Sequence, residues 1–286
     1  MLNERGKIML PRTDLAVERR ELIGEKIPDG VRFDEITDGE TKTTKIEIKN
    51  ENGEKALGKP KGRYYTVEFK NCAAPTDEND PQLKAVISLF DELLPEDGTV
   101  LVAGLGNEQI TPDALGPRTV NGVFATRHIT DKSDQLGLPA LRQVAAVSTG
   151  VLGQTGMETV EILKAVCEKI KPSAVIVIDA LASAGTKRLG RTVQITDTGI
   201  CPGSGVGNSR ARIDRRTLDT TVISVGVPTV IDASSLCREE GQNVEQMMVT
   251  PRNIDSIISD MSRLLSMSIN MSLQKNLSFS LINGLF

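Results

Sequence analysis

The stretch Gly104-Leu105-Gly106-Asn107-Glu108-Gln109-Ile110-Thr111-Pro112-Asp113-Ala114-Leu115-Gly116-Pro117 decides the fold class. It follows the apolar run 99–103, which is short and bounded by glycines, as is typical of a buried strand. The glycines allow a sharp turn where that strand ends, and Asp113 stands where a helix should begin. In open α/β sheets, active sites lie just outside the carboxyl ends of the strands. Asp113 is therefore either a catalytic carboxylate or a helix N-cap.

A second carboxylate ends another strand pattern. The apolar run 174–178 leads directly into Asp179. Two carboxylates at the ends of two strands can converge across one sheet, where they would share a proton because both cannot ionise cheaply. One would then act as a base toward water and the other as an acid toward a leaving amine. The alternative is that Asp179 only caps a turn or anchors a loop.

The composition of the chain limits the kinds of protein that it can be. The chain has 286 residues and a net charge of −4, with no Trp, two Tyr and six Phe. This length allows one large or two small domains, and the acidic balance and scarce aromatic residues disfavour a nucleic-acid binder. No apolar run reaches about 18 residues, so we expect no membrane span. We therefore predict a cytoplasmic protein without direct nucleic-acid or membrane partners.

Cysteine and histidine are informative through their scarcity. The single histidine, His128, cannot supply an H-E-x-x-H zinc site. The four cysteines are widely spaced, which favours reduced thiols in a cytosolic protein over a disulfide framework. Only Cys201, which lies in a glycine-rich loop, is a candidate nucleophile. A packing role for this cysteine is the simpler interpretation. The cysteines are Cys72, Cys167, Cys201 and Cys237.

The order of apolar patterns predicts an α/β fold with a mostly parallel sheet flanked by helices. Apolar and polar residues alternate in 42–49, which predicts an antiparallel β-appendage near the N-terminus. Residues 1–35 show no clear hydrophobic period and resemble a polar arm. The expected strands are 42–49, 63–69, 99–103, 143–148, 174–179, 192–196 and 221–225, and the expected helices are 82–94, 113–128, 156–170 and 252–271. We see no linker and expect a single domain.

Two further glycine-rich loops, 148–159 and 197–210, follow expected strands. Neither contains the Lys of a P-loop, although a nucleotide or small-ligand binding module stays an alternative. Such loops can also line a groove for a peptide backbone, and a nearby arginine can bind a substrate carboxylate bidentately. The alternatives are plain tight turns and a solvated charged face. The candidate groove residues are Gly150, Gly153, Thr155, Gly203, Gly205 and Arg210.

At this point the chain resembles a known family, the germination protease family of spore-forming bacteria (peptidase family A25). The resemblance is carried by residues 12–18 (Arg-Thr-Asp-Leu-Ala-Val-Glu), 104–117, 148–159, 178–183 and 197–208. These stretches extend over most of the chain, in order, so the resemblance is specific.

The resemblance implies an endopeptidase with Asp113 and Asp179 as its essential aspartates. Members degrade small acid-soluble spore proteins, cutting after an acidic residue and before a hydrophobic residue followed by Ala. They are made as zymogens that remove their own leader. By this resemblance, residues 1–14 are a propeptide cleaved between Asp14 and Leu15, and residues 15–286 are one peptidase domain. It also implies a homotetramer in the forespore and spore core.

A more distant resemblance is to the hydrogenase maturation proteases, which implies a phosphorylase/hydrolase-like sheet. Those enzymes recognise nickel through Glu, Asp and His ligands. Where they carry Glu, beside Asp113, this chain has Ala114, and it has one histidine in all. We therefore predict no metal and no cofactor, and a metal-dependent maturation protease stays an alternative.

Overall fold

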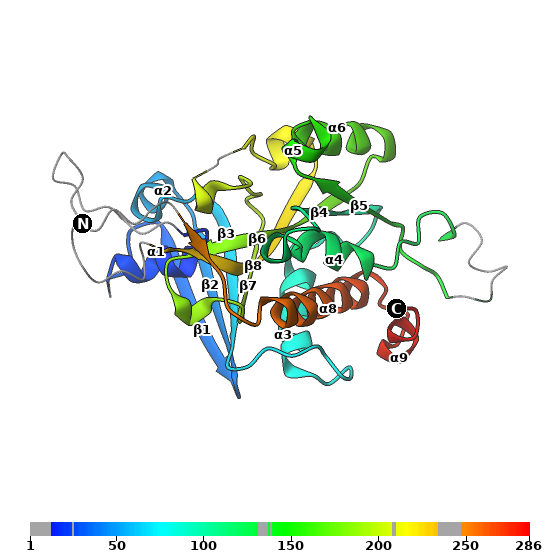
Figure 1. Cartoon of the computed structure of the whole chain (residues 1–286), viewed down its shortest axis with the longest axis horizontal. Coiled ribbons are helices and arrows are strands. Elements are labelled where there is room, and N and C mark those ends of the chain that lie inside the picture. The colour runs from blue at the N-terminus through cyan, green and yellow to red at the C-terminus, as the bar shows by residue number, and fades with distance from the viewer. Residues whose placement is uncertain (1–12, 25, 131–136, 138, 208–209, 234–246) are drawn as a thin grey trace.

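The computed structural model describes residues 13–24, 26–130, 137, 139–207, 210–233 and 247–286 (Figure 1). In these residues nine strands form one mixed sheet, in the order β1-β2-β3-β7-β8-β6-β4-β5, with β9 on β8. The strands are β1 (Val31–Asp38), β2 (Thr41–Ile48), β3 (Gly62–Phe69), β4 (Val100–Leu105), β5 (Val144–Gly150), β6 (Ala174–Ser183), β7 (Thr192–Thr196), β8 (Thr221–Asp232) and β9 (Met248–Val249).

The helices flank this sheet. They are α1 (Ala16–Leu22), α2 (Glu51–Leu57), α3 (Pro81–Leu93), α4 (Leu115–Asn121), α5 (Leu152–Thr155), α6 (Thr159–Ile170), α7 (Arg215–Leu218), α8 (Ile254–Leu273) and α9 (Phe279–Asn283). Short 3-10 helices include η1 (Thr111–Asp113) and η5 (Ser204–Val206). In the described part of the chain, no helix is both long enough and apolar enough to cross a membrane.

The parallel half of the sheet consists of β5, β4, β6 and β8, and the predicted α/β fold is confirmed. These strands are apolar because helices cover both faces. Strands β6 and β8 continue to Ser183 and Asp232, well beyond the predicted ends, and stay paired with each other over that extension. Ala182, whose backbone N–H and carbonyl contact the N-terminal segment described below, lies on this extension.

The antiparallel half consists of β1, β2, β3 and β7. Strand β3 pairs with β7, which pairs with β8, so the predicted appendage is continuous with the main sheet. Strand β1 and helix α1 lie in the stretch that we predicted to be a polar arm, and there the prediction was wrong. Strand β1 is an edge strand exposed along most of its length, so it lacks the apolar alternation that would have indicated a strand.

Three apolar clusters hold the layers together. Helices α3, α4 and α8 cover one face, where Phe90 and Leu264 belong to the largest cluster. On the other face α6 and α7 cover the parallel strands through Leu163 and Leu218. The third cluster joins Leu15 near α1 to α2 and strands β2 and β3. Figure 1 shows α1 and α2 beside the antiparallel half and α6 beside the parallel half.

Two predicted helices are shorter than expected. Helix α4 ends at Asn121, not at residue 128, because the chain turns at Gly122 and the Phe124 N–H donates to Asn270 Oδ1 at 2.8 Å. His128 is consequently exposed in a turn outside any helix. The 156–170 helix begins only at Thr159, since Gly156 adopts a left-handed φ of 69° that ends α5.

The glycines of the first motif bring helix α4 close to the sheet. A Cβ on Gly116 would lie 2.3 Å from the Leu105 carbonyl oxygen and 2.7 Å from the Ile178 carbonyl oxygen. Only a residue without a side chain can therefore lie over β4 and β6 here. This packing fixes η1, and with it Asp113, beside the end of β6.

Candidate active site

Asp113 and Asp179 line one cavity of about 290 Å³, beside the carboxyl end of β4 and the second half of β6. Asp113 belongs to η1, and its Oδ2 accepts a hydrogen bond from the Asn107 N–H at 2.6 Å. Asp179 lies on β6 and is 7% exposed, with Oδ1 accepting from the Ala180 N–H at 2.9 Å. The two predicted carboxylates are thus brought together at one site.

The pKa values of both carboxyl groups are raised at this site. Burial raises the pKa of Asp113, and the hydrogen bond from Asn107 opposes the shift. Burial raises the pKa of Asp179 well above its usual value, and the negative charges of Asp113 and Asp14 raise it further. A buried carboxyl group next to other carboxylates favours its protonated form. Of the two carboxyl groups, Asp179 therefore has the stronger shift toward the protonated form.

Asp14 enters the same cavity from the N-terminal segment. Its N–H donates to the Ala182 carbonyl at 2.9 Å, so the segment runs along the extension of β6. Its carboxylate accepts from the Ala182 N–H at 2.9 Å and from the Ser204 hydroxyl at 2.8 Å. The acidic side chain of Asp14 is thus held by neutral donors beside the two aspartates.

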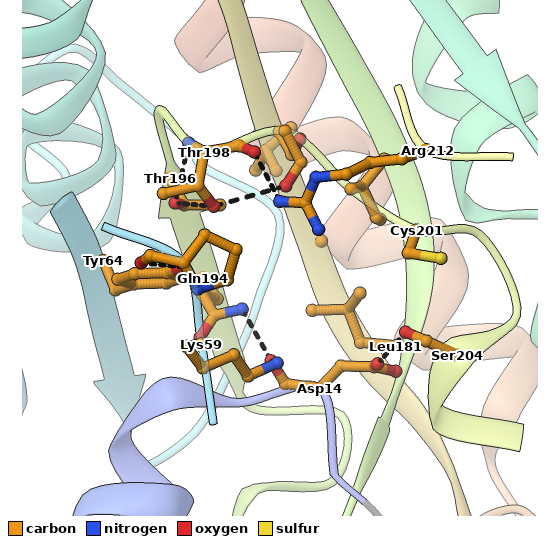
Figure 2. Close-up of a pocket in the computed structure, with 16 residues that line it drawn as sticks. Asp14, Lys59, Tyr64, Leu181, Gln194, Thr196, Thr198, Cys201, Ser204 and Arg212 are labelled. Atoms are coloured by element: carbon orange, nitrogen blue, oxygen red, sulfur yellow. Dashed lines mark hydrogen bonds between the residues drawn. The ribbon is translucent and has the colours of Figure 1, made fainter. Parts of the chain in front are cut away.

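The peptide between Asp14 and Leu15 is held from the other side. The Asp14 carbonyl oxygen accepts from Lys59 Nζ at 2.9 Å and from Gln194 Nε2 at 3.1 Å, and Figure 2 shows both side chains directed to Asp14. Leu15 and Ala16 follow with no exposed surface. Leu15 packs in the cluster that contains Leu57 and Leu181. At the predicted cleavage position Leu15 is therefore buried, whereas Asp14 is half-buried.

Helix α1 fixes this segment through an ion cluster around the buried Arg188. Arg188 is 2% exposed, and its guanidinium lies 2.6 Å from Glu21 and 3.0 Å from Glu68. Glu18 lies 3.7 Å from the same group and also accepts hydrogen bonds from Thr13 and the Ala184 N–H. These contacts anchor both sides of the Asp14–Leu15 peptide.

Comparison with known proteins decides the family. The family model described as germination protease matches residues 12–244. The chain belongs to the germination protease family. It is accordingly a peptidase, as the family resemblance predicted.

Curated relatives support this assignment over nearly the full length. A germination protease of Caldanaerobacter subterraneus subsp. tengcongensis is 39% identical, with 96% of this chain and 97% of the relative covered. One of Clostridium perfringens is 38% identical, with 95% and 98% covered. Another of Clostridium tetani is 39% identical, with 96% and 99% covered.

A solved structure aligns weakly with this chain. The crystal structure of a [NiFe] hydrogenase maturation protease HycI from Thermococcus kodakarensis KOD1 aligns with a TM-score of 0.38 and 15% identity. The alignment covers 65% of this chain and 98% of that chain. The family assignment rests on the family model and the curated relatives.

The loop after β7 contributes two of the predicted groove residues to the site of this germination protease family member. Gly203 and Gly205 line the cavity that holds Asp113 and Asp179. A Cβ on Gly205 would lie 2.1 Å from Asp14 Oδ2. The Asp14 carboxylate therefore occupies the space that a side chain at position 205 would fill.

The loop after β5 contacts the loop that contains Asp113 and does not line the cavity itself. Gly150, Gly153 and Thr155 are outside the described lining of the cavity that holds the aspartates. Their segment reaches the Asp113 loop through Gln154, whose Nε2 donates to Asn107 Oδ1 at 2.8 Å. These three residues therefore border the site without contacting Asp14 through any described hydrogen bond.

Arg210 does not reach Asp14. Its Nη1 lies 3.9 Å from Glu158 Oε1 at the start of α6. The donors to the Asp14 carboxylate are Ser204 and the Ala182 N–H instead. The physical reason is that Arg210 lies beside the opposite charge of Glu158, while a backbone N–H and a hydroxyl donate to the Asp14 carboxylate.

Sequence reasoning missed Lys59, Gln194 and Ser204. Lys59 lies between two expected strands, and Gln194 lies in the expected strand 192–196. Strand β7 is in fact buried along its whole length. A glutamine in the middle of a buried strand needs hydrogen-bond partners, and that was the available signal for Gln194.

The cysteines and possible metal ligands add no second site in the described residues. Cys72 and Cys167 have free thiols whose pKa is raised by burial, to about 12 and about 11. Cys201 Sγ lies 3.1 Å from the Arg210 carbonyl oxygen, and Cys237 is outside the described residues. No group of three or more potential metal ligands gathers in the described ranges.

Proposed function

We propose that this peptidase is an endopeptidase of spore germination that cleaves small acid-soluble spore proteins after an acidic residue and before a hydrophobic residue followed by Ala. The observation that carries the proposal is the position of Asp14 in the cavity of Asp113 and Asp179. Asp14-Leu15-Ala16 has the sequence of such a site, so the N-terminal segment is held as a substrate would be.

The two aspartates would divide the acid and base roles. Asp179, with its raised pKa, would hold the proton, and Asp113 would act as the carboxylate that activates water. Water would attack the carbonyl carbon of residue 14, and the proton on Asp179 would go to the leaving nitrogen of Leu15. This assignment makes the enzyme an aspartic-type peptidase.

The contacts around Asp14 and Leu15 support the proposed specificity. Donors to the carboxylate, Ser204 and the Ala182 N–H, favour an acidic residue before the cut. The apolar cluster around Leu15 favours a hydrophobic residue after it, and Ala16 has no exposed surface, which favours a small residue next. The same groove would take the corresponding residues of a substrate protein.

We further propose that the chain is a zymogen that removes residues 1–14 itself. While the Asp14 segment occupies the groove, a substrate cannot enter it. Residues 1–12 are outside the described part of the structure, so this proposal rests on residues 13–18. A homotetramer in the forespore and spore core, acting without cofactor, metal or direct nucleic-acid or membrane partners, completes the proposal.

Intact-mass measurement of the full chain over time tests the proposal. We expect the mass of residues 1–14 to be lost, with Leu15 as the new N-terminus, at a first-order rate independent of protein concentration. A folded chain that stays intact would overturn the zymogen proposal. Self-cleavage that exhaustive chelation abolishes would favour the metal-dependent maturation protease, and specific nucleotide binding without cleavage would favour the binding module.

A further inference from the structure

We propose that Lys59 and Gln194 bind the carbonyl oxygen of the scissile peptide and stabilise the negative charge that develops on it during hydrolysis. This inference rests on the proposed function, because it takes the Asp14–Leu15 peptide as the bond that is cut. It adds an oxyanion site to the two aspartates and identifies the residues that form it.

The first observation is a pair of donors on one oxygen. Lys59 Nζ lies 2.9 Å and Gln194 Nε2 lies 3.1 Å from the Asp14 carbonyl oxygen (Figure 2). Two N–H donors at this distance, one of them charged, form the arrangement that stabilises a tetrahedral intermediate. The carbonyl oxygen is therefore bound on the side of β7, while the carboxylate of Asp14 lies against β6.

The second observation is that Gln194 also binds on the other side of the peptide. Its Oε1 accepts from the Ala16 N–H at 2.7 Å. One amide thus contacts the backbone of residues 14 and 16 and fixes the position of Leu15 between them. Because both contacts are to backbone atoms, any substrate with this local conformation could make them.

The third observation is the alignment of Gln194 with Asp179. Gln194 pairs with Gly226 on β8, and Gly226 pairs with Asp179 on β6, so the three residues form one row across the sheet. Residues in register on adjacent strands point to the same face. Gly226 has no side chain, and Leu181 from β6 packs over it: a Cβ on Gly226 would lie 2.6 Å from Leu181 Cγ.

The electrostatic environment of Lys59 fits this role. Burial lowers its pKa, and the positive charges of Arg19 on α1 and Arg212 after β7 lower it further, whereas Asp14 and Cys201 raise it. A partly desolvated ammonium group gains more from a developing negative charge than an exposed one. Lys61, two residues along the chain, is exposed and is a matched control.

The reaction balances without any other reagent. The oxygen of water bonds to the carbonyl carbon of residue 14 as one proton of water passes to a carboxylate. The π electrons of the carbonyl move to its oxygen, where Lys59 and Gln194 donate hydrogen bonds. When the intermediate collapses, the carbon–nitrogen bond breaks and the nitrogen of Leu15 takes up a proton.

The test is the first-order rate of self-cleavage in the full chain. We expect Lys59→Met and Gln194→Met to slow it about 100-fold, the effect of losing one oxyanion donor, while Lys61→Met stays within threefold of the parent. Lys59→Arg should restore part of the rate because it keeps the charge. A Lys59→Met rate within threefold of the parent would overturn the inference, provided that the parent cleaves. A parent that does not cleave would instead contradict the proposed function.

The pH profile distinguishes a direct role from a structural one. Because Asp179 donates a proton in the proposed mechanism, the rate should fall in the parent and in the variants as Asp179 ionises. In the parent a further alkaline fall should occur below the usual lysine pKa, as Lys59 loses its proton. Lys59→Arg should lack that alkaline fall, because a guanidinium stays charged. An identical alkaline fall in Lys59→Arg would show that another group titrates and would overturn the role of Lys59.

Discussion

Asp113, on η1 after β4, and Asp179, on the adjacent strand β6, line one cavity, and the charge of Asp113 raises the pKa of Asp179. The two groups are held differently. Asp113 accepts a hydrogen bond from a loop N–H, whereas the described hydrogen bond to Asp179 comes only from its own neighbour on β6. Unequal surroundings of this kind separate a proton-holding acid from a carboxylate base.

Asp179 should reduce stability at neutral pH. Its folded-state pKa is raised, so above the pKa of the unfolded chain the folded state binds more protons, and the free energy of unfolding falls as pH rises through the folded pKa. We expect Asp179→Asn to raise the thermal midpoint at pH 7 more than at pH 4. Asp38→Asn, at an exposed position, is the control. Equal effects at both pH values would contradict the raised pKa.

Arg188 should be essential for the anchoring of α1. Removing it leaves Glu18 and Glu68 with charges that are poorly exposed and unpaired. Breaking such a buried network costs about 3–5 kcal/mol, so Arg188→Met should lower the free energy of unfolding by that amount in urea titrations. Arg191→Met, at an exposed position, should change it by less than about 0.5 kcal/mol. A similar small loss in both variants would show that the cluster does not stabilise the fold.

Gly205 should be required for an acidic residue at the cut. A methyl group there would lie 2.1 Å from Asp14 Oδ2 and 2.7 Å from Ala182 Cβ. Overpacking of this kind costs about 1–3 kcal/mol, so Gly205→Ala should slow self-cleavage about tenfold to a hundredfold. Gly185→Ala is the matched control, because Gly185 has an extended φ of −155° and no atom within 4 Å of its added Cβ. Equal rates in the two variants would contradict the assigned position of the carboxylate.

The parallel strands and both aspartates could be predicted because their signals are local. The apolar run 174–178 fills a buried strand, and the acid that follows it lies within β6 where the pairing with β4 ends. The glycines at 104, 106 and 116 indicated the turn and the close helix. These features depend on neighbours within a few residues.

The rest of the site depends on contacts between distant segments. Asp14 contacts Ser204, 190 residues away, and Gln194, 180 residues away. Arg210 was the predicted partner of the acidic side chain, but it lies beside Glu158. The Ser204 hydroxyl donates to the Asp14 carboxylate instead. No spacing in the sequence indicates which side chain of the loop after β7 donates to the Asp14 carboxylate in the folded protein.

The most direct test of the central claim is cleavage of the peptide Thr-Glu-Leu-Ala-Ser-Glu, followed by mass spectrometry. The enzyme would be a chain beginning at Leu15, compared with its Asp113→Asn and Asp179→Asn variants. We predict a single cut between Glu and Leu, slowed about 10³-fold or more in each variant, with all three chains folded by circular dichroism. A cut that persists at the parental rate in either variant would contradict the paired-aspartate mechanism, and an intact peptide with the folded parent would contradict the proposed specificity.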